Sequence, residues 1–325
     1  MVKIISYSRL NLGLIDLTRQ PFRIDGSTGF AIDLKASEIT LFESQVCNCK
    51  LNCKNTDRIQ NTLSNCIKKI NNRNFSIEVN SYVDEHIGFG LGTQLNMSIV
   101  KAFDKEFKLK MNIDEMASLA NSGGTSNIGV FSFLHGGFNV DSGRKFPDEK
   151  NNVGPGEIFL FNRLSPLLMR MDMPEWYICI VVPFVEKKVY GKIEVDFFHK
   201  YTPLSDEEVN KLCRCILTGL LPAVKCNDFD LFCCSIENCM SLGLKKREID
   251  TYNGVVNESM ICLKELGARG VGMSSFGPAV FGFFESMESA VSCYENLKKL
   301  NNFKNVYLTK PRNSGADVIT DFYRD

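Results

Sequence analysis

Histidine and tryptophan are scarce in this chain of 325 residues, and neither positive nor negative charge is in excess. It contains three histidines and one tryptophan, and its 38 Lys and Arg residues balance its 38 Asp and Glu residues. Because a broad nucleic-acid surface needs a basic excess, this balance argues against a nucleic-acid partner. One small, locally basic pocket for a phosphorylated metabolite stays compatible with it.

The sequence also lacks a long apolar run. The longest, Trp176 to Val185, contains Pro183, and it is far shorter than the ~20 residues that a membrane-spanning helix requires. The apolar start, Met1 to Ile5, is too short for a signal peptide. We therefore expect a soluble, cytoplasmic protein that has no membrane partner.

Cysteine is the abundant exception among the rarer residue types. The chain has 13 cysteines, an odd number scattered along its length, which argues against a complete disulfide framework and fits a reducing cytosol. Cys47, Cys49, Cys53 and Cys66 suggest a zinc site, but paired C-x2-C spacing and a nearby histidine are missing. The alternative is a set of free thiols on a strand-and-loop segment.

The length is about twice that of a usual domain and predicts two domains. A stretch rich in proline and glycine, 144–170, is the best candidate for their junction. We place the domains at 1–165 and 166–325. Strands and helices alternate on both sides of the junction, which favours an α+β fold. The apolar patterns predict strands at 2–8, 30–34, 39–46, 75–83, 176–182, 279–284 and 303–308, and helices at 56–70, 95–103, 205–221, 228–241, 250–266 and 287–300.

The strongest local signal is the glycine-rich segment His86 to Gln94, between a predicted strand and a predicted helix. Glycines there allow close backbone approach, so that successive N–H groups and the positive end of the helix face an anion. It is not a Walker loop, because no Gly-Lys-Ser/Thr follows. The segment predicts a phosphate-binding loop, and a plain structural turn is the alternative.

Several motifs, collinear from about residue 4 to residue 317, carry a resemblance to a known family. The segments 90–94 (GLGTQ) and 272–279 (GMSSFGPA) resemble the central and C-terminal glycine motifs of the GHMP kinase superfamily. Within that superfamily the chain resembles the β-ribofuranosylaminobenzene 5'-phosphate synthases of methanopterin biosynthesis. The segments that point to this branch are 9–16 (RLNLGLID), 23–29 (RIDGSTG), 123–129 (GGTSNIG) and 135–141 (HGGFNVD).

The resemblance implies a fold, a reaction and an assembly. The fold is a GHMP-kinase-like two-domain fold, with a ribosomal S5 domain 2-like N-terminal domain and a ferredoxin-like C-terminal domain. Phosphoribosyl pyrophosphate is the implied donor, and 4-aminobenzoate or 4-hydroxybenzoate is the implied acceptor. A ring carbon attacks C1 of the ribose, pyrophosphate leaves and the carboxyl group departs as CO2. Mg²⁺ is the implied cofactor and a homodimer the implied assembly.

The same resemblance assigns roles to residues of this chain. Asp16, Arg23 and Asp25 are the expected catalytic residues, and Asp16 and Asp25 either coordinate Mg²⁺ or stabilise an oxocarbenium-like ribosyl centre. An ordinary loop salt bridge between Asp16 and Arg23 is the alternative. The expected substrate- and phosphate-binding residues are Arg9, Gly88, Gly90, Gly92, Thr93, Gln94, Gly124, Thr125, Ser126, Ser274 and Ser275.

Two positions depart from the family pattern, since we expect His where Asn11 stands and Arg where Ser122 stands. They would mark a divergent paralogue with another acceptor. An ATP-dependent small-molecule kinase is the second hypothesis, but the segment 123–129 holds Asn127 where such a kinase carries an aspartate base. A non-catalytic metabolite sensor is the third.

Overall fold

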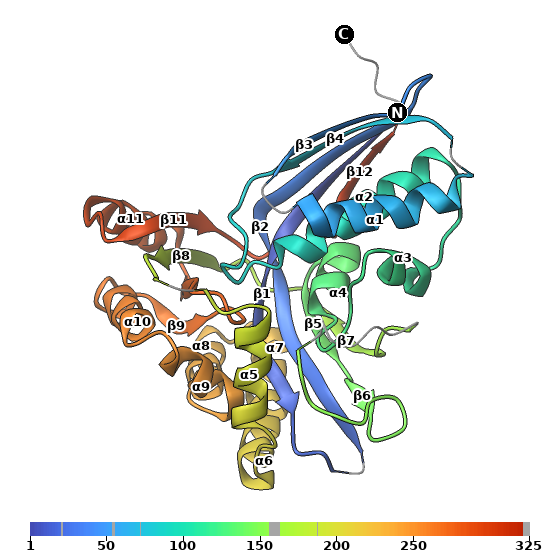
Figure 1. Ribbon diagram of the computed structural model, residues 1–325. Coiled ribbons are helices and arrows are strands. Elements are labelled where there is room, and N and C mark those ends of the chain that lie inside the picture. Colours follow the sequence, from blue (N-terminus) through green and yellow to red (C-terminus); the bar gives the residue numbers. More distant parts are fainter. Residues whose placement is uncertain (21, 54–55, 72, 156–162, 187, 321–325) are drawn as a thin grey trace.

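The computed structural model describes all residues except 21, 54–55, 72, 156–162, 187 and 321–325. Figure 1 shows two long strands, β1 and β2, running through the molecule between two groups of helices. One group covers the larger sheet and the other covers a smaller, second sheet. No helix in the described ranges is long and apolar enough to cross a bilayer.

The larger sheet has eight strands, in which β12-β1-β2-β4-β3 form the main path and β5, β6 and β7 extend it. Its helices α1 and α2 pack against each other, and α2 also packs on β1 and β2. The elements of this half are β1 (Val2–Asp16), β2 (Arg23–Glu43), β3 (Asn48–Asn52), α1 (Thr56–Lys69), β4 (Phe75–Ser81), α2 (Leu91–Glu106), α3 (Ile113–Leu119), α4 (Ile128–His135), β5 (Phe138–Asp141), β6 (Arg144–Lys145), β7 (Leu167–Met171) and β12 (Asp317–Thr320).

Buried and partly exposed residues alternate along the first half of β1, as a strand with one covered face requires. Ile4 on β1 lies opposite Ile39 on β2, and both are fully buried under the helices. The β1–β2 register shifts three times between Ser6 and Gly13. Such bulges bend a strand and redirect its side chains, and here they begin where β1 enters the centre of the molecule.

The smaller sheet has the order β11-β8-β10-β9, and all its pairs are antiparallel. Because the chain runs β8, helices, β9, β10, α11, β11, this order is that of a ferredoxin-like unit and confirms the predicted C-terminal fold. Its elements are β8 (Tyr177–Pro183), α5 (Lys192–Tyr201), α6 (Asp206–Cys215), a π-helical segment (Ile216–Leu220), α7 (Leu221–Cys226), α8 (Phe229–Met240), α9 (Gly243–Asp250), α10 (Val255–Glu265), β9 (Arg269–Met273), β10 (Val280–Phe284), α11 (Met287–Lys299) and β11 (Phe303–Thr309).

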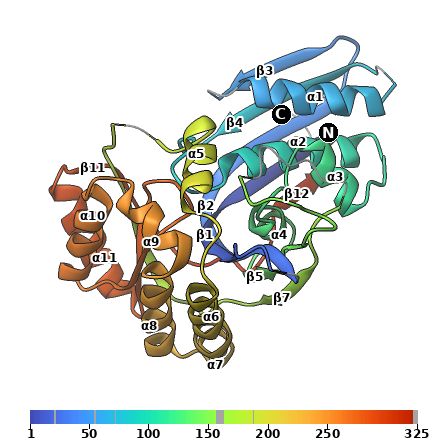
Figure 2. The same ribbon diagram turned by 60° about the horizontal axis from the view of Figure 1, so that its bottom comes forward.

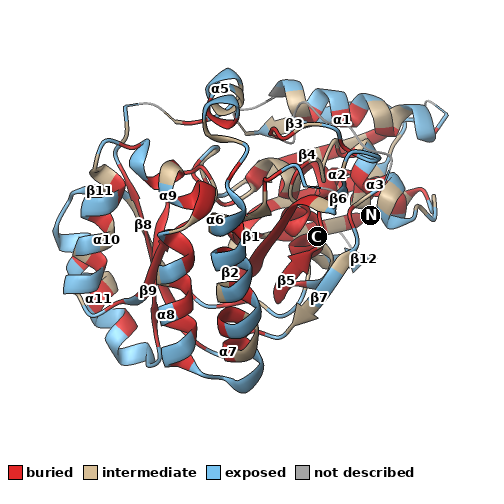
Figure 3. Cartoon of the chain, turned by 90° about the horizontal axis from the view of Figure 1, so that it is seen from below, coloured by how far each residue is buried: buried red, intermediate tan, exposed pale blue. Residues whose placement is uncertain are grey.

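The sheets divide the chain close to the predicted boundary between 1–165 and 166–325, with two crossings. Strand β7 pairs with β5, and β12 pairs with β1, so both join the larger sheet although they follow residue 165. Part of the predicted junction, 156–162, lies outside the described residues. Figure 2 shows the two halves meeting along β1 and β2, with α5 and α9 beside these strands. In Figure 3 the buried residues lie on the strands and on the inner sides of the surrounding helices.

The thirteen cysteines are all free thiols. Cys47 and Cys49 are exposed next to and on β3, whereas Cys66 is buried in α1. These thiols therefore do not share one environment. Within the described ranges, no three His, Cys, Asp or Glu side chains are grouped as metal ligands.

Candidate active site

The glycine-rich loop and the start of α2 form the base of a cavity between the two halves. Gly90 is the N-cap of α2 in the left-handed conformation (φ 73°), and the first turn of α2 contains no acidic residue. The backbone N–H groups and the positive end of a helix of 16 residues therefore face the cavity without a competing carboxylate in that turn. This geometry agrees with the predicted phosphate-binding loop.

Three segments far apart in the sequence interlock at this loop. The side chain of Ser274 donates to the carbonyl of Gly88 at 2.7 Å and accepts from the backbone N–H of Asn11 at 3.1 Å. A Cβ on Gly88, where φ is 101°, would stand 2.3 Å from the carbonyl oxygen of Ser274, and a Cβ on Gly277 would stand 1.9 Å from the backbone nitrogen of Gly88. Only glycine fits at both positions. Ser274 is fully buried, so it holds the loop in place rather than lining the cavity.

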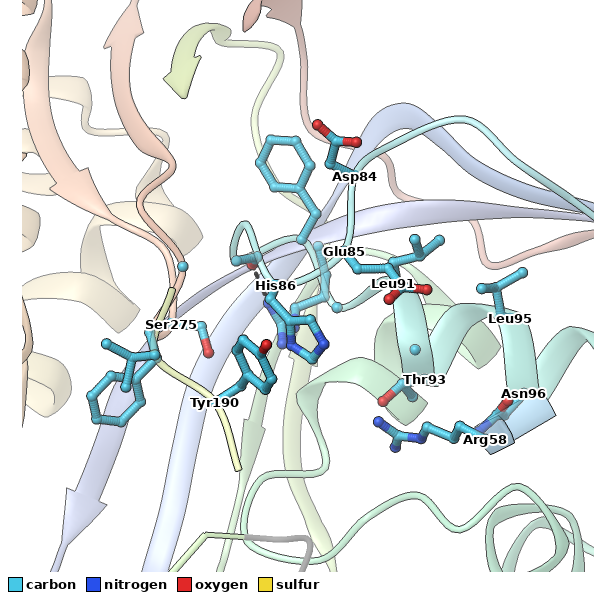
Figure 4. Close-up of a pocket in the computed structure, with 18 of the residues that line it drawn as sticks. Arg58, Asp84, Glu85, His86, Leu91, Thr93, Leu95, Asn96, Tyr190 and Ser275 are labelled. Carbon is cyan, nitrogen blue, oxygen red and sulfur yellow. Dashed lines mark hydrogen bonds between the residues drawn. The ribbon is translucent and has the colours of Figure 1, made fainter. Parts of the chain in front are cut away.

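The cavity at the loop has a volume of about 190 Å³. Figure 4 shows Arg58 reaching from α1 toward Thr93 at the start of α2, and His86 lying against Tyr190. The rings of His86 and Tyr190 are stacked with 4.3 Å between their centroids. Gly88, Gly90, Gly92 and Thr93 all line this cavity, as predicted from the sequence.

A second cavity of about 240 Å³ continues from the first. The residues that line both are Arg9, Arg58, Thr93, Glu194, Ser275 and Phe276. The two cavities therefore form one cleft with two parts, which we call the loop part and the inner part. The predicted residues Gly124, Thr125 and Ser126 line the inner part, together with the apolar side chains of Leu14 and Phe198.

Arg9 is the central cation of this cleft. One guanidinium nitrogen (Nη1) donates to the carbonyl of Gly88, and a Cβ on Gly90 would stand only 3.0 Å from Cζ of Arg9. Its Nε is buried and has no hydrogen-bond partner among the described residues. Burial lowers the pKa of Arg9 to about 10, so the guanidinium is charged at neutral pH. A buried charge needs a counter-charge, which an anion in the cleft would supply.

Polar contacts hold the segment 123–129 against β1 and β2. Ser126 accepts from the side-chain amide of Asn11 at 3.0 Å and lies 2.7 Å from the hydroxyl of Ser27. Ser27 in turn donates to Asp141, which is fully buried. Burial raises the pKa of Asp141, and hydrogen bonds from Ser27 and backbone N–H groups oppose this shift. Asn11, which stands where the family pattern has His, is thus part of a hydrogen-bond network at the wall of the inner part.

The structure supplies no kinase base in this segment. Asn127 is fully buried, and its amide donates to the carbonyl of Gly123 at 3.0 Å and accepts from the N–H of Ser165 at 2.9 Å. A Cβ on Gly129 would stand 3.1 Å from the methyl group of Thr93, so that methyl fills the place of a side chain. A carboxylate able to accept a proton from a substrate hydroxyl is therefore missing from 123–129.

Five of the predicted site residues do not line either part of the cleft: Ser274, Gln94, Asp16, Arg23 and Asp25. The side-chain amide of Gln94 donates to the carbonyl of Gly129 at 2.9 Å and holds α2 against α4. Asp16 and Arg23 lie at the far end of the β1–β2 hairpin, Asp16 seven residues beyond Arg9 and thus roughly 23 Å along the strand. Their expected catalytic roles stay predictions.

Among the described contacts, Asp16 and Arg23 do not form the loop salt bridge that was the alternative to their catalytic roles. Asp16 accepts from the N–H and hydroxyl of Thr18 at 2.8 and 2.7 Å. Among the described residues, Arg23 pairs with Glu149 at 3.5 Å rather than with Asp16, and it donates to the carbonyl of Gly143 at 2.7 Å. These contacts fix the hairpin end against the loop that follows β5.

Asp25 does not fit the magnesium and catalytic roles that we expected for it. It is fully buried in an ion pair with Lys150 at 2.8 Å, and the side chains of both residues are 0% exposed. Burial raises the pKa of Asp25 to about 6, and Lys150 opposes the shift. Because both side chains are fully buried and Asp25 lines neither part of the cleft, a metal ion bound with substrate would not reach this carboxylate, and the pair supports the structure instead.

The cleft contains five charged residues that the sequence did not single out. Asp84 and Glu85 precede the glycine loop, and Arg58, Glu194 and Glu248 come from helices. Arg58 follows the start of α1, Glu194 lies in the first turn of α5, and Glu248 lies in α9. None of these three belongs to a glycine motif. They reach the cleft only because three helices distant in the sequence converge on it, which no local pattern reveals.

Comparisons with known proteins agree with this architecture. Residues 57–137 match the family described as GHMP kinases N terminal domain. The structure is similar to that of homoserine kinase from Cytophaga hutchinsonii, with a TM-score of 0.67 and 18% identity over 98% of this chain and 97% of that one. A likeness at this identity confirms the GHMP-kinase-like fold and says nothing further.

The sequence relatives are more specific. The chain is 30% identical to β-ribofuranosylphenol 5'-phosphate synthase of Archaeoglobus fulgidus, over 98% of this chain and 99% of the relative. It is 31% identical to the protein of the same name from Methanothermobacter thermautotrophicus, over 96% of this chain and 97% of the relative. The resemblance found in the sequence is thereby confirmed, although the relatives' names contain phenol where we expected aminobenzene. The chain belongs to the β-ribofuranosylphenol 5'-phosphate synthase family.

Proposed function

We propose that this protein is a decarboxylating glycosyltransferase that joins phosphoribosyl pyrophosphate to 4-hydroxybenzoate. The product would be a C-riboside 5'-phosphate, with CO2 and pyrophosphate released. The name of the relatives contains ribofuranosylphenol 5'-phosphate, the compound class that this reaction yields from a hydroxybenzoate. With 4-aminobenzoate as the acceptor, the same chemistry would yield the aminobenzene product.

The observation that carries the proposal is the division of the cleft into two chemically different parts. The loop part combines the N-terminus of α2 with the guanidinium groups of Arg9 and Arg58, which suits a pyrophosphate group. The inner part is walled by Phe198 and Phe276, which lie side by side with ring centroids 6.1 Å apart. Such walls suit a flat benzoate ring and exclude the water that would hydrolyse a ribosyl cation.

Each residue set has a definable task in this reaction. The backbone N–H groups of the loop, Arg9 and Arg58 would absorb the charge that develops on the departing pyrophosphate. Carbon–carbon bond formation would take place where the two parts meet, beside Thr93 and Glu194. No strong base at the ring carbon is needed, because CO2 leaves from the position where a proton would otherwise leave.

Magnesium stays part of the proposal, with different ligands from those we expected. Asp25 does not fit, whereas the hydroxyl of Thr93 and the carboxylate of Glu194 line both parts of the cleft. Oxygen atoms of this kind are the ligands that Mg²⁺ prefers together with substrate phosphates. A bound Mg²⁺ would neutralise charge on the pyrophosphate.

We also propose a cytoplasmic homodimer. The thirteen free thiols support a reducing compartment, and the dimer follows the family expectation. Light scattering on the purified protein would test the dimer.

The direct test is turnover. Purified protein with phosphoribosyl pyrophosphate, 4-hydroxybenzoate and Mg²⁺ is expected to release CO2 and pyrophosphate in equal amounts. Release of neither product with both 4-hydroxybenzoate and 4-aminobenzoate would reject the proposal. Phosphate transfer from ATP to an alcohol would support the kinase hypothesis, and tight binding of a phosphate ester without any turnover would support the sensor hypothesis.

A further inference from the structure

A buried ion pair, Lys245 and Glu248, stands at the wall of the inner part of the cleft. The two residues are one helical turn apart on α9, their charged ends are in direct contact, and their side chains are 4% and 6% exposed. Glu248 lines the inner part together with Phe198 and Phe276. Burying a carboxylate at the wall of a cavity is costly, so such a group is a candidate for function.

The surroundings hold this pair in a fixed position. Lys245 also donates to the carbonyl of Ser275 at 3.1 Å, which ties α9 to the C-terminal glycine motif. Gly13 on β1, where φ is 133°, lies against the pair, since a Cβ there would be in van der Waals contact with Cε of Lys245 at 3.5 Å. Lys245 occupies only Oε2 of Glu248, and the other carboxylate oxygen accepts no hydrogen bond from the described residues.

We propose that Glu248 is the residue that recognises and activates the para-hydroxyl or para-amino group of the benzoate acceptor, with Lys245 as its positioning residue. The proposal rests on the function proposed above and assigns a specific site to the acceptor. An aromatic ring packed against Phe198 and Phe276, whose rings contact each other, would point one end toward the junction with the loop part. Its opposite, para end would then lie toward α9.

The chemistry balances around a single shuttled proton. As the ring carbon that bears the carboxylate bonds to C1 of the ribose, the C–O bond to pyrophosphate breaks and pyrophosphate keeps the electron pair. The para-hydroxyl proton passes to Glu248, which leaves a cyclohexadienone with the carboxylate on its saturated ring carbon. The bond to CO2 then breaks, its electrons restore the aromatic ring, and Glu248 returns the proton to the phenolate oxygen.

Burial favours this use of Glu248. It raises the pKa of the carboxyl group, and the nearby Lys245 ammonium opposes the shift. A carboxylate with a raised pKa is a better proton acceptor for a phenol than an ordinary exposed one. Without the proton acceptor, the ring would carry a positive charge in the intermediate.

The test compares Glu248→Gln with the wild-type protein on two acceptors. With 4-hydroxybenzoate, kcat is expected to fall by about 10² to 10³, while KM for phosphoribosyl pyrophosphate changes by less than about threefold. With 3-fluoro-4-hydroxybenzoate, whose phenol is more acidic and needs less help from a base, the loss is expected to shrink by about tenfold. Glu207→Gln, on an exposed carboxylate in α6, is the matched control and leaves both activities unchanged.

Because Glu248→Gln leaves Lys245 buried without its counter-charge, the double variant Lys245→Met/Glu248→Met provides a second measurement. Replacing a buried ion pair by apolar side chains of similar size is commonly tolerated, and the same loss of kcat is expected. A folded variant with kcat within about threefold of wild type would overturn the inference. An equal loss with both acceptors together with a raised KM for the donor would also overturn it, since a structural role does not distinguish phenols. If the wild-type protein makes no product, the proposed function itself is rejected. Failure of the proposed function is thus distinguishable from failure of the role proposed for Glu248, which is judged on an active wild-type protein.

Discussion

Replacing Arg9 by glutamine removes the central cation of the cleft while keeping a polar side chain. Its guanidinium packs against the backbone of Gly90, so a phosphate held by the glycine loop would lie within about 4 Å of the charge. Two unit charges at that distance attract by about 4 kcal/mol at an effective dielectric constant of ~20. After the cost of removing water, a net loss of about 2–4 kcal/mol is expected, or roughly 30- to 1000-fold in affinity.

The assay is calorimetric titration of phosphoribosyl pyrophosphate at pH 7, at low and high salt. Burial lowers the pKa of Arg9 to about 10, so the wild-type guanidinium is protonated under these conditions. Arg9→Lys keeps the charge but loses the fork that binds two phosphate oxygens, and we expect an intermediate affinity. Arg73→Gln, on an exposed arginine that pairs with Glu43, is the matched control.

A folded Arg9→Gln protein that binds the donor within about threefold of wild type would refute this reasoning. Equal weakening by Arg73→Gln would refute it as well, because the effect would then come from overall charge. The wild-type affinity should fall only modestly with salt, since a partly buried ion pair is screened less than an exposed one.

The remaining predictions concern the glycine loop and the buried pair at Asp25. Gly277→Ala is expected to cost about 3 kcal/mol or more of folding free energy and to abolish donor binding, because the added methyl meets the backbone of Gly88 at 1.9 Å. Gly92→Ala is expected to keep the melting temperature, since its methyl meets only the flexible end of Arg58 at 2.9 Å, and to weaken donor binding by about tenfold. Lys150→Met is expected to cost about 3–5 kcal/mol, because it leaves Asp25 as an unpaired buried charge. The pKa of Asp25 is raised from 3.8 in the unfolded chain to about 6 in the folded protein. As the pH rises, the carboxyl group is therefore deprotonated in the unfolded chain before it is deprotonated in the folded protein. The free energy of unfolding falls by up to about 3 kcal/mol between these two pH values. Asp25→Asn should flatten that dependence in denaturant titrations.

Each of these predictions has an outcome that would contradict it. Wild-type stability of Gly277→Ala would show that the C-terminal motif does not pack against the loop as described. A large loss of melting temperature in Gly92→Ala would mean that Arg58 supports the fold. If Lys150→Met is as stable as the wild type, Lys150 does not neutralise a buried charge on Asp25. If Asp25→Asn keeps the wild-type pH dependence of stability, the raised pKa of Asp25 does not cause that dependence.

Where apolar periodicity was strong, the sequence predicted the elements well. The helix predicted at 56–70 is α1, and the one predicted at 205–221 begins as α6 with a capping box of Ser205 and Glu208. The predicted strand at 2–8 was too short, because Arg9, Asn11 and Gly13 interrupt the alternation in β1. Bulges in the pairing with β2 accommodate these residues, and such long-range pairing leaves no local pattern.

Several elements were missed or wrongly bounded for a similar reason. The helix predicted at 250–266 is α10, which begins only at Val255 after the N-cap Gly254, and α9 was not predicted. Strands β5, β7 and β12 are short and gain their stability from neighbours distant in the sequence. The helix α5, which brings Glu194 to the cleft, was not predicted either.

The residues of the candidate site were predicted where a local motif carries the signal and missed where long-range packing does. The glycine loop, Arg9 and Ser126 were predicted because backbone geometry and motif order carry the signal, and they meet as expected. Asp25 does not line the cleft as expected, because only the three-dimensional structure brings Lys150 to its carboxylate. Arg58 and Glu248 escaped prediction because their positions depend on how whole helices pack.

Mass spectrometry of the reaction products tests the central claim most directly. Purified protein is incubated with phosphoribosyl pyrophosphate, Mg²⁺ and 4-hydroxybenzoate labelled with ¹³C at the carboxyl carbon. The proposed reaction yields a ribosylphenol 5'-phosphate without the label, together with one labelled CO2 for each molecule formed. Its ribose and phenol are joined by a carbon–carbon bond that resists acid hydrolysis. A product that retains the label, or one that acid splits into ribose phosphate and hydroxybenzoate, would contradict it.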